Sequence, residues 1–302
     1  MPTGRLQRNK CHSPESDNLI THVYQRGWGN VDWTYPFEDT SHYLVHMGIG
    51  LAGVDYLSVE EYNTRKHSTH HIMPGAGEVD IMIRLTRIVP ALLSDDAQTF
   101  ENLVRQTEGF TDYAQFDIMD GEFVPSTSIA CDHISALHTK LRWEAHLMVM
   151  YPENHLEAFR QAGAEKAVFH FEATPSPLTV IARARSLGLE VGLAVNPEST
   201  VSDIIALVPA VDSVLFLTVH PGFYGAKFLP EVLDKVVELR SYLPNVEIGV
   251  DGGIKENNVL EVARLGVDVI YVGSAISLQP DPAESFRHLQ ALAHEGSRQR
   301  VQ

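Results

Sequence analysis

Eight short apolar runs, each followed by an amphipathic stretch, constrain the fold of this 302-residue chain more than any other feature. The runs favour β structure and begin 21 to 33 residues apart, which suits a strand, a turn and a helix. Because the runs are almost continuously apolar, they indicate a parallel sheet that is covered on both faces. We expect strands at residues 88–93, 114–119, 143–149, 167–170, 190–195, 213–219, 246–250 and 267–272.

The stretches between these runs favour helices. Residues 200–208 and 257–266 have helical spacing, and Gly266 stands where a helix C-cap would fall. Eight βα units in roughly 200 residues lie at the lower end of the usual size of a closed (β/α)8 barrel. We therefore expect an α/β fold of that type. A doubly wound open sheet is the runner-up, since periodicity does not show closure.

The first part of the chain follows a different pattern. Residues 1–81 contain two of the three tryptophans and seven of the fifteen histidines, with weak periodicity. We expect a barrel over residues 82–302 and an N-terminal extension of unknown structure before it, either an appended segment or an upstream extension of the reading frame that is not translated. His67, His70 and His71 would share one helix face, but without a carboxylate pattern they favour a solvated cluster over a metal site.

Composition and charge exclude several classes of protein. The 44% hydrophobic residues rule out wholesale disorder. The formal charge of -16 and the absence of a basic run exclude nucleic acid and anionic membranes as partners. Of this charge, residues 1–81 hold 6 Lys+Arg and 10 Asp+Glu (-4), which leaves -12 on residues 82–302. An anionic metabolite stays open, because backbone N–H groups and a bound cation can supply local positive potential.

The sequence also bears on location and on cysteine chemistry. Neither end resembles a signal peptide, and the longest uncharged apolar stretch, residues 43–52, is too short to span a membrane. We therefore expect a soluble cytoplasmic protein. Cys11 and Cys131 are too few and too far apart for a disulfide framework or a cysteine-based zinc site.

Ionisable residues stand at the ends of three predicted strands. In a (β/α)8 barrel the reactive groups lie at the C-terminal ends of the strands. Asp117 and His146 lie near the ends of the second and third strands, and Asp251 directly follows the seventh. Burying such groups on apolar strands is costly, so the coincidence favours a functional site over three separate strand-end polar residues. Asp117 and Asp251 would form an acid/base pair, and His146 would assist as a ligand of a divalent cation that stabilises an enediolate.

Glycines follow the last three predicted strands. They are Gly222 and Gly225 after the sixth, Gly252 and Gly253 after the seventh, and Gly273, followed by Ser274, after the eighth. Glycines let successive N–H groups converge on an anion, and the loops after strands 7 and 8 are the recurrent phosphate site of this barrel. Gly pairs are more often simple turns, but at these two loops we favour a phosphate site.

Six ordered motifs resemble the ribulose-phosphate 3-epimerase family, over about residues 86–285. They read VPALLS at 89–94, DIMDGEFVP at 117–125, HLMV at 146–149, TVHPGF at 218–223, VDGG at 250–253 and VGSAI at 272–276. Other phosphate-binding barrels share only the last two. The resemblance implies a (β/α)8 barrel of the phosphate-binding type and an isomerase of the pentose phosphate pathway. Its substrate would be a small sugar phosphate, and family habit implies a homo-oligomer.

The resemblance also implies a reaction and a set of roles. The family interconverts D-ribulose 5-phosphate and D-xylulose 5-phosphate, and one aspartate removes the C3 proton while another reprotonates the opposite face of an enediolate. Asp117 and Asp251 would take these roles and also bind one divalent metal (Zn, Fe, Mn or Mg) with His146. The substrate would contact a hydroxyl, an imidazole, two thioethers and the glycine loops, that is Ser94, His146, Met119, Met148, Gly222, Gly225, Gly252, Gly253, Gly273 and Ser274.

The sequence departs from the family pattern at four positions. Gln115 replaces the metal-ligating histidine two residues before the first aspartate, and an amide oxygen suits Mn or Mg better than Zn or ferrous iron. Leu217 replaces a methionine, and His220 and Tyr224 replace the Asn and Gly of the phosphate loop; His220 we interpret as a loop residue. Two alternatives stay open: an epimerase for another ketose phosphate, such as D-allulose 6-phosphate, and a non-catalytic sugar-phosphate-binding barrel.

Overall fold

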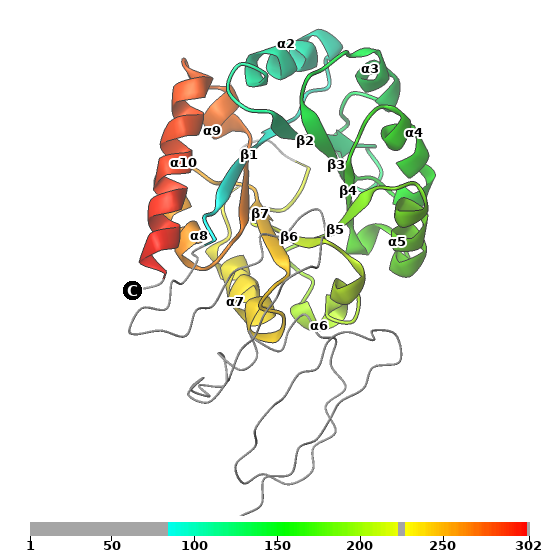
Figure 1. The fold of residues 1–302 in the computed structure, drawn as a ribbon. Coiled ribbons are helices and arrows are strands. Elements are labelled where there is room, and N and C mark those ends of the chain that lie inside the picture. Colours follow the sequence, from blue (N-terminus) through cyan, green and yellow to red (C-terminus); the bar gives the residue numbers. More distant parts are fainter. Residues whose placement is uncertain (1–83, 223–226, 301–302) are drawn as a thin grey trace, which may run out of the picture. The chain divides into compact units, whose positions relative to one another are not determined.

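The strands of the chain close into a parallel barrel. The computed structural model describes residues 84–222 and 227–300. Within them β1 to β8 pair in chain order, and β8 pairs with β1, so the ring is closed (Figure 1). This confirms the predicted (β/α)8 fold, and the open-sheet alternative is wrong. The strands are Arg87–Leu92, Tyr113–Met119, Arg142–Met148, Lys166–His170, Glu190–Val195, Ser213–Leu217, Glu247–Asp251 and Val269–Val272.

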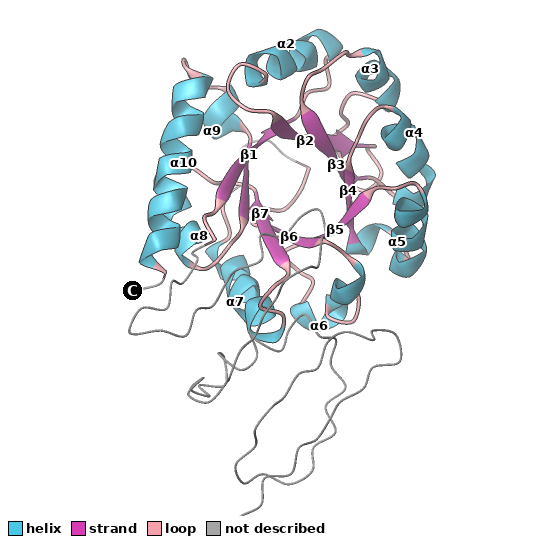
Figure 2. Cartoon of the chain, in the orientation of Figure 1, coloured by secondary structure: helices cyan, strands magenta, loops and turns pink. Residues whose placement is uncertain are grey.

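Helices surround the strands, as Figure 2 shows. Each lies on the outside of the ring and covers the apolar outer face of the sheet. Short 3-10 turns occur in several connections, at Pro152–Asn154, Phe171–Ala173, Val208–Ala210 and Pro230–Val232. The helices are α2 Ala97–Thr107, α3 Cys131–Ala136, α4 Leu156–Gln161, α5 Pro177–Ser186, α6 Val201–Ile204, α7 Leu233–Tyr242, α8 Val259–Arg264, α9 Ser274–Ser277 and α10 Pro282–Gln299.

The helices that the sequence predicts over residues 200–208 and 257–266 both form, but each is shorter than predicted. Over residues 200–208 only α6 is an α-helix, because Pro209 lacks an N–H and the chain turns into the 3-10 segment Val208–Ala210. The second expected helix is α8. Gly266 ends it as predicted, with φ at 89° and its N–H donated to the carbonyl of Ala263.

Several expectations fall on residues that the structure does not describe. The extension over residues 1–81, with His67, His70, His71 and Cys11, lies outside the described residues, and the domain boundary at residue 82 stays a prediction. Cys131 is a free thiol. Across residues 84–222 and 227–300, none of the helices is long and apolar enough to cross a membrane.

The apolar core has two layers because strand side chains alternate between the two faces of the sheet. Outward-facing residues pack against the helices, where Phe116 stacks on Trp143 with ring centroids 4.5 Å apart and meets the edge of Phe100. Inward-facing residues fill the barrel. They form an apolar cluster of Val89, Ala91, Val168, Ala194, Leu215, Leu217, Val269 and Tyr271.

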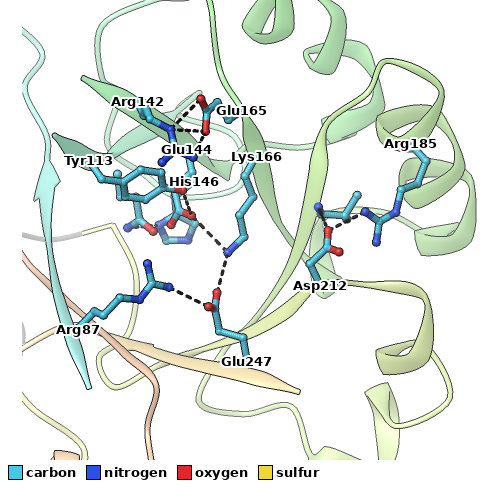
Figure 3. A network of polar contacts seen from close by, with 12 residues as sticks. Arg87, Tyr113, Arg142, Glu144, His146, Glu165, Lys166, Arg185, Asp212 and Glu247 are labelled. Carbon is cyan, nitrogen blue, oxygen red and sulfur yellow. Dashed lines mark hydrogen bonds and ion pairs between the residues drawn. The ribbon is translucent and has the colours of Figure 1, made fainter. Parts of the chain in front are cut away.

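A charged cluster lies at the N-terminal ends of the strands, which we call the ionic floor: the buried Glu144 and Lys166 and the more exposed Glu247 and Arg87. In Figure 3 the Lys166 ammonium group lies between the two carboxylates. It is 3.3 Å from Glu144 and 3.4 Å from Glu247, and Arg87 contacts Glu247 at 2.8 Å. Burial alone would lower the pKa of Lys166, but the two carboxylates outweigh it and raise that pKa. The lysine therefore remains charged in the barrel.

Replacing Lys166 should test how much the ionic floor contributes. In Lys166→Met both carboxylates lose their buried cation, and removing one partner of a buried pair costs about 3–5 kcal/mol of unfolding free energy. Adding Glu144→Gln should restore part of the loss, because the amide carries no charge. Urea unfolding followed by circular dichroism measures both effects.

The matched control is Arg142→Met, which breaks the exposed pair between Arg142 and Glu165 (2.6 Å; 58% and 41% exposed). Solvent screens such a pair, so the loss should stay below about 1 kcal/mol. Equal losses in Lys166→Met and Arg142→Met would contradict the assigned role of the floor.

Candidate active site

Four polar side chains from three strands meet inside the C-terminal end of the barrel. Asp117 and Gln115 come from β2, His146 from β3 and Asp251 from β7. Nδ1 of His146 lies 2.9 Å from Oδ1 of Asp117 and 3.6 Å from Oδ2 of Asp251. One ligand atom from each of Asp117, His146 and Asp251 lies within 4.8 Å of the others. The predicted acid/base pair and its histidine are therefore one cluster.

The strand register brings these groups together. Asp117 stands directly opposite His146 in the β2–β3 pair, so their side chains share the inner face. Asp251 ends β7, and the hydroxyl of Thr218 donates to its carbonyl at 2.9 Å. Gly252 then turns the chain at φ 108°, and a Cβ at that position would overlap Val219. The residue after Asp251 must therefore be a glycine for the carboxylate to lie where it does.

Gln115 presents its amide NH₂ group to the cluster. Nε2 donates to Asp117 at 3.0 Å and to Asp251 at 3.4 Å, and it lies 3.4 Å from Nδ1 of His146. Its oxygen, Oε1, is buried and has no hydrogen-bond partner. The predicted doubtful ligand thus lies beside the other three, with its nitrogen toward them.

Burial shapes the protonation of the cluster. Burial and the negative charge of Asp117 raise the pKa of Asp251 to about 7, against the opposing effects of His146 and Gln115. Burial would lower the pKa of His146, but the hydrogen bond to Asp117 and the two aspartate charges outweigh it and raise that pKa. Near neutral pH the cluster therefore retains a proton that an exposed aspartate would have released.

The two predicted methionines lie at the same end of the barrel. Met119 and Met148 are register partners at the ends of β2 and β3, and they pack with Val124, Leu93 and Phe123. Ser94 is buried after β1, where its hydroxyl donates to the carbonyl of Asp96 and accepts from its N–H. The Ser94 hydroxyl thus forms hydrogen bonds with the backbone of the turn that follows β1.

The predicted glycines follow β6, β7 and β8 at the same end of the barrel. At some of these positions close packing leaves no room for a side chain. Gly222 has a φ of 99°, and a Cβ there would lie 2.9 Å from Cβ of Val124. Gly253 has a φ of 68°, and Gly273 precedes Ser274, which begins α9 and is exposed. Gly225 lies outside the described residues, as does Tyr224. Their role in holding phosphate stays a prediction.

His220 is an exposed loop residue, as expected. Its side chain is 64% exposed, and its Nδ1 lies 2.7 Å from a carboxylate oxygen of Glu198, which is equally open to solvent. Leu217, the other departure in this region, is buried in the apolar cluster inside the barrel.

The sequence interpretation missed two polar residues next to the cluster, one buried and one partly buried. His170 ends β4, and its Nε2 lies 3.0 Å from Nε2 of His146. Glu172, two residues later, has a carboxylate oxygen 3.5 Å from Nδ1 of His170. Burial lowers the pKa of His170 to about 4, so this ring is neutral. The rule that selected His146, a polar residue at a strand end, applies equally to His170.

A closed parallel barrel with two carboxylates and an imidazole at the C-terminal ends of its strands has the arrangement in which barrel enzymes place their active sites. Comparison with known proteins makes this specific. A profile of the Ribulose-phosphate 3 epimerase family matches residues 87–277. The chain belongs to that family, and it is an epimerase, an enzyme of the isomerase class.

Individual relatives agree with the profile. The chain is 36% identical over 210 residues to the ribulose-phosphate 3-epimerase of Schizosaccharomyces pombe, covering 68% of this chain and 92% of the relative. It is 35% identical over 221 residues to the ribulose-phosphate 3-epimerase, cytoplasmic isoform, of Oryza sativa. The match covers 70% of this chain and 95% of the relative. A solved 3-hexulose-6-phosphate synthase from Salmonella typhimurium shares the fold, with a TM-score of 0.54, 18% identity and coverage of 69% and 98%.

The raised pKa of Asp251 predicts how the stability of the metal-free protein depends on pH. Between the ordinary aspartate value of 3.8 and about 7, the folded protein holds a proton that the unfolded chain has released. The stabilisation is full below that interval and is lost as the pH rises through it. The unfolding free energy of the wild type should therefore fall relative to that of Asp251→Asn, whose amide does not titrate. Urea unfolding in a chelator, at several pH values, measures this difference. A difference that stays flat with pH would contradict the shift.

Proposed function

We propose that this protein is a metal-dependent 3-epimerase that interconverts D-ribulose 5-phosphate and D-xylulose 5-phosphate. The observation that carries the proposal is the pair of largely buried carboxylates, Asp117 from β2 and Asp251 from β7, which lie beside one imidazole at the C-terminal end of the barrel. Inverting a carbon centre through a planar intermediate requires one base on one face and one acid on the other. Two carboxylates on different strands can supply these two groups.

The chain's own residues account for the two proton transfers. Asp117 removes the C3 proton, and Asp251 donates its proton to the opposite face of the enediolate; in the reverse direction the roles exchange. The thioethers of Met119 and Met148 lie at the same mouth and offer polarisable, apolar contacts to a planar intermediate. They also exclude water that would otherwise quench it.

The donor set fits a divalent cation. Asp117, His146 and Asp251 would hold it, and their carboxylate and imidazole atoms suit Zn, Fe, Mn or Mg. A bound cation would polarise the substrate oxygens and lower the barrier to forming the enediolate. The partnerless Oε1 of Gln115 supports a fourth ligand, because turning the amide over would exchange Nε2 for that oxygen. An amide oxygen favours the harder cations, Mn and Mg.

We assign substrate recognition to the loops around the mouth. Backbone N–H groups of Gly222, Gly225, Gly252, Gly253, Gly273 and Ser274 would hold the phosphate, with Ser94 on the sugar. The names of the relatives support a sugar phosphate as substrate, and that of the Oryza sativa isoform supports a cytoplasmic location. A homo-oligomer is also part of the proposal.

The test is a coupled assay of the full chain with D-ribulose 5-phosphate across several divalent metals, run in D₂O so that the product gains deuterium at C3. Turnover only with D-allulose 6-phosphate would identify a different ketose phosphate as the substrate. Phosphate-ligand binding without turnover with either substrate and any metal would instead indicate a non-catalytic barrel.

Replacing either carboxylate should abolish epimerisation while the fold survives. Asp117→Asn and Asp251→Asn each remove one proton-transfer group, which is worth about 10²–10⁴-fold in rate. Circular dichroism checks folding, and the control is Asp132→Asn, whose side chain is 81% exposed on α3, outside the cluster. Full activity in either of the first two variants would refute the two-base mechanism.

Gln115 should set the choice of metal. Gln115→His exchanges an amide for an imidazole, so we expect the ratio of zinc to manganese affinity to rise. Gln115→Met keeps the length but offers no oxygen, so manganese binding should weaken. Isothermal titration of the metal-free proteins gives both affinities, and an unchanged ratio in Gln115→His would show that residue 115 does not ligate.

A further inference from the structure

A chain of polar groups leads away from the candidate metal site through β4 to the partly buried Glu172. His146 and His170 face each other edge to edge through their Nε2 atoms, 3.0 Å apart, with ring planes 21° from parallel. Both rings are fully buried. On the far side of His170, Nδ1 faces Oε2 of Glu172 at 3.5 Å, and these last two atoms have no hydrogen-bond partner.

The positions of the ring hydrogens decide whether Nδ1 of His170 can donate to Oε2 of Glu172. With both rings neutral, one hydrogen lies between the two Nε2 atoms, and it belongs to either His170 or His146. If His170 carries it, His170 Nδ1 is bare and faces a carboxylate oxygen, so two buried acceptors oppose each other. Such unsatisfied buried groups are costly. If His146 carries it, His170 has its hydrogen on Nδ1 and donates it to Glu172.

The second arrangement has a consequence at the other ring. His146 then points a bare Nδ1 at Asp117 and Asp251, which is favourable only when a cation or a further proton lies between them. We propose that His170 and Glu172 are positioning residues, which fix the tautomer of His146 so that Nδ1 is the nitrogen presented to a divalent cation. Both arrangements carry the same number of protons, so the effect is a choice of tautomer and not a titration.

Glu172 is held in place for this role. Its other oxygen accepts the N–H of Asn196 at 2.9 Å and the hydroxyl of Ser199 at 2.5 Å. Burial would raise the pKa of Glu172, but the neighbouring polar groups of His170, Ser199 and Asn196 outweigh it and lower that pKa. The carboxylate is therefore a fixed, charged acceptor for His170 Nδ1–H. Carboxylate–histidine contacts of this kind orient metal ligands in other proteins, and losing them costs about 10–100-fold in metal affinity.

Glu172→Gln tests the proposal with a single-atom change. The amide can still accept from Asn196 and Ser199 through its oxygen, while its NH₂ group donates to His170 Nδ1 and so favours the wrong tautomer. We expect Co²⁺ to bind the metal-free full chain about 10–100-fold more weakly, as measured by calorimetry and by cobalt absorption. The control, Glu165→Gln, changes an exposed carboxylate just before the other end of β4 and should leave the affinity unchanged.

A tautomer measurement gives an independent readout. In ¹⁵N spectra of the zinc-loaded wild type, His170 should carry its hydrogen on Nδ1 and His146 on Nε2. The inference rests on the proposed metal site, and the outcomes separate the two. Wild-type chain that binds none of Co²⁺, Zn²⁺ and Mn²⁺ would overturn both. Normal Co²⁺ affinity in Glu172→Gln, or a hydrogen on Nε2 of His170 in the zinc form, would overturn the positioning role and leave the metal site standing.

Discussion

The repulsion between the buried carboxylates of Asp117 and Asp251 is the constraint on which the rest of the site depends. Two like charges at close range in a poorly solvated space are unfavourable unless something intervenes. The structure offers several compensating groups: a retained proton on Asp251, the NH₂ group of Gln115 and the imidazole of His146. A divalent cation held by these side chains would add a further positive charge between the two carboxylates. The proposed proton transfer and the proposed cation binding both address this one electrostatic problem.

Much of the fold was predictable because it depends on local patterns. Eight apolar runs at regular spacing predict the strands, and the rule that barrel sites lie at strand ends selects Asp117, His146 and Asp251. Closure was not predictable from these patterns, since it arises from pairing between β1 and β8. Gln115 was recognised as a departure from the family, but the direction of its amide depends on three neighbours from other positions along the chain.

The polar residues that were missed share a physical reason. His170 and Glu172 matter through contacts with each other and with His146, and a single sequence does not show which inward-facing residues meet across strands. The same holds for Lys166, which reads as an ordinary charged residue at the start of a strand. Its burial between Glu144 and Glu247 becomes visible only once β3, β4 and β7 close around it.

The ionic floor explains why nearby groups must balance the negative charges of Asp117 and Asp251 at the C-terminal end of the barrel. Within the floor, Glu144 and Glu247 are balanced by Lys166 and Arg87, so the four charges sum to zero. The floor therefore provides no net positive potential from below for the two aspartates, and Glu144 itself acts to raise the pKa of His146. Groups at the level of the carboxylates must supply the balance. This is how a chain with a formal charge of -16 could accept the proposed anionic substrate: the proposed cation and backbone N–H groups would act over a few ångströms, while salt screens the more distant surface charges.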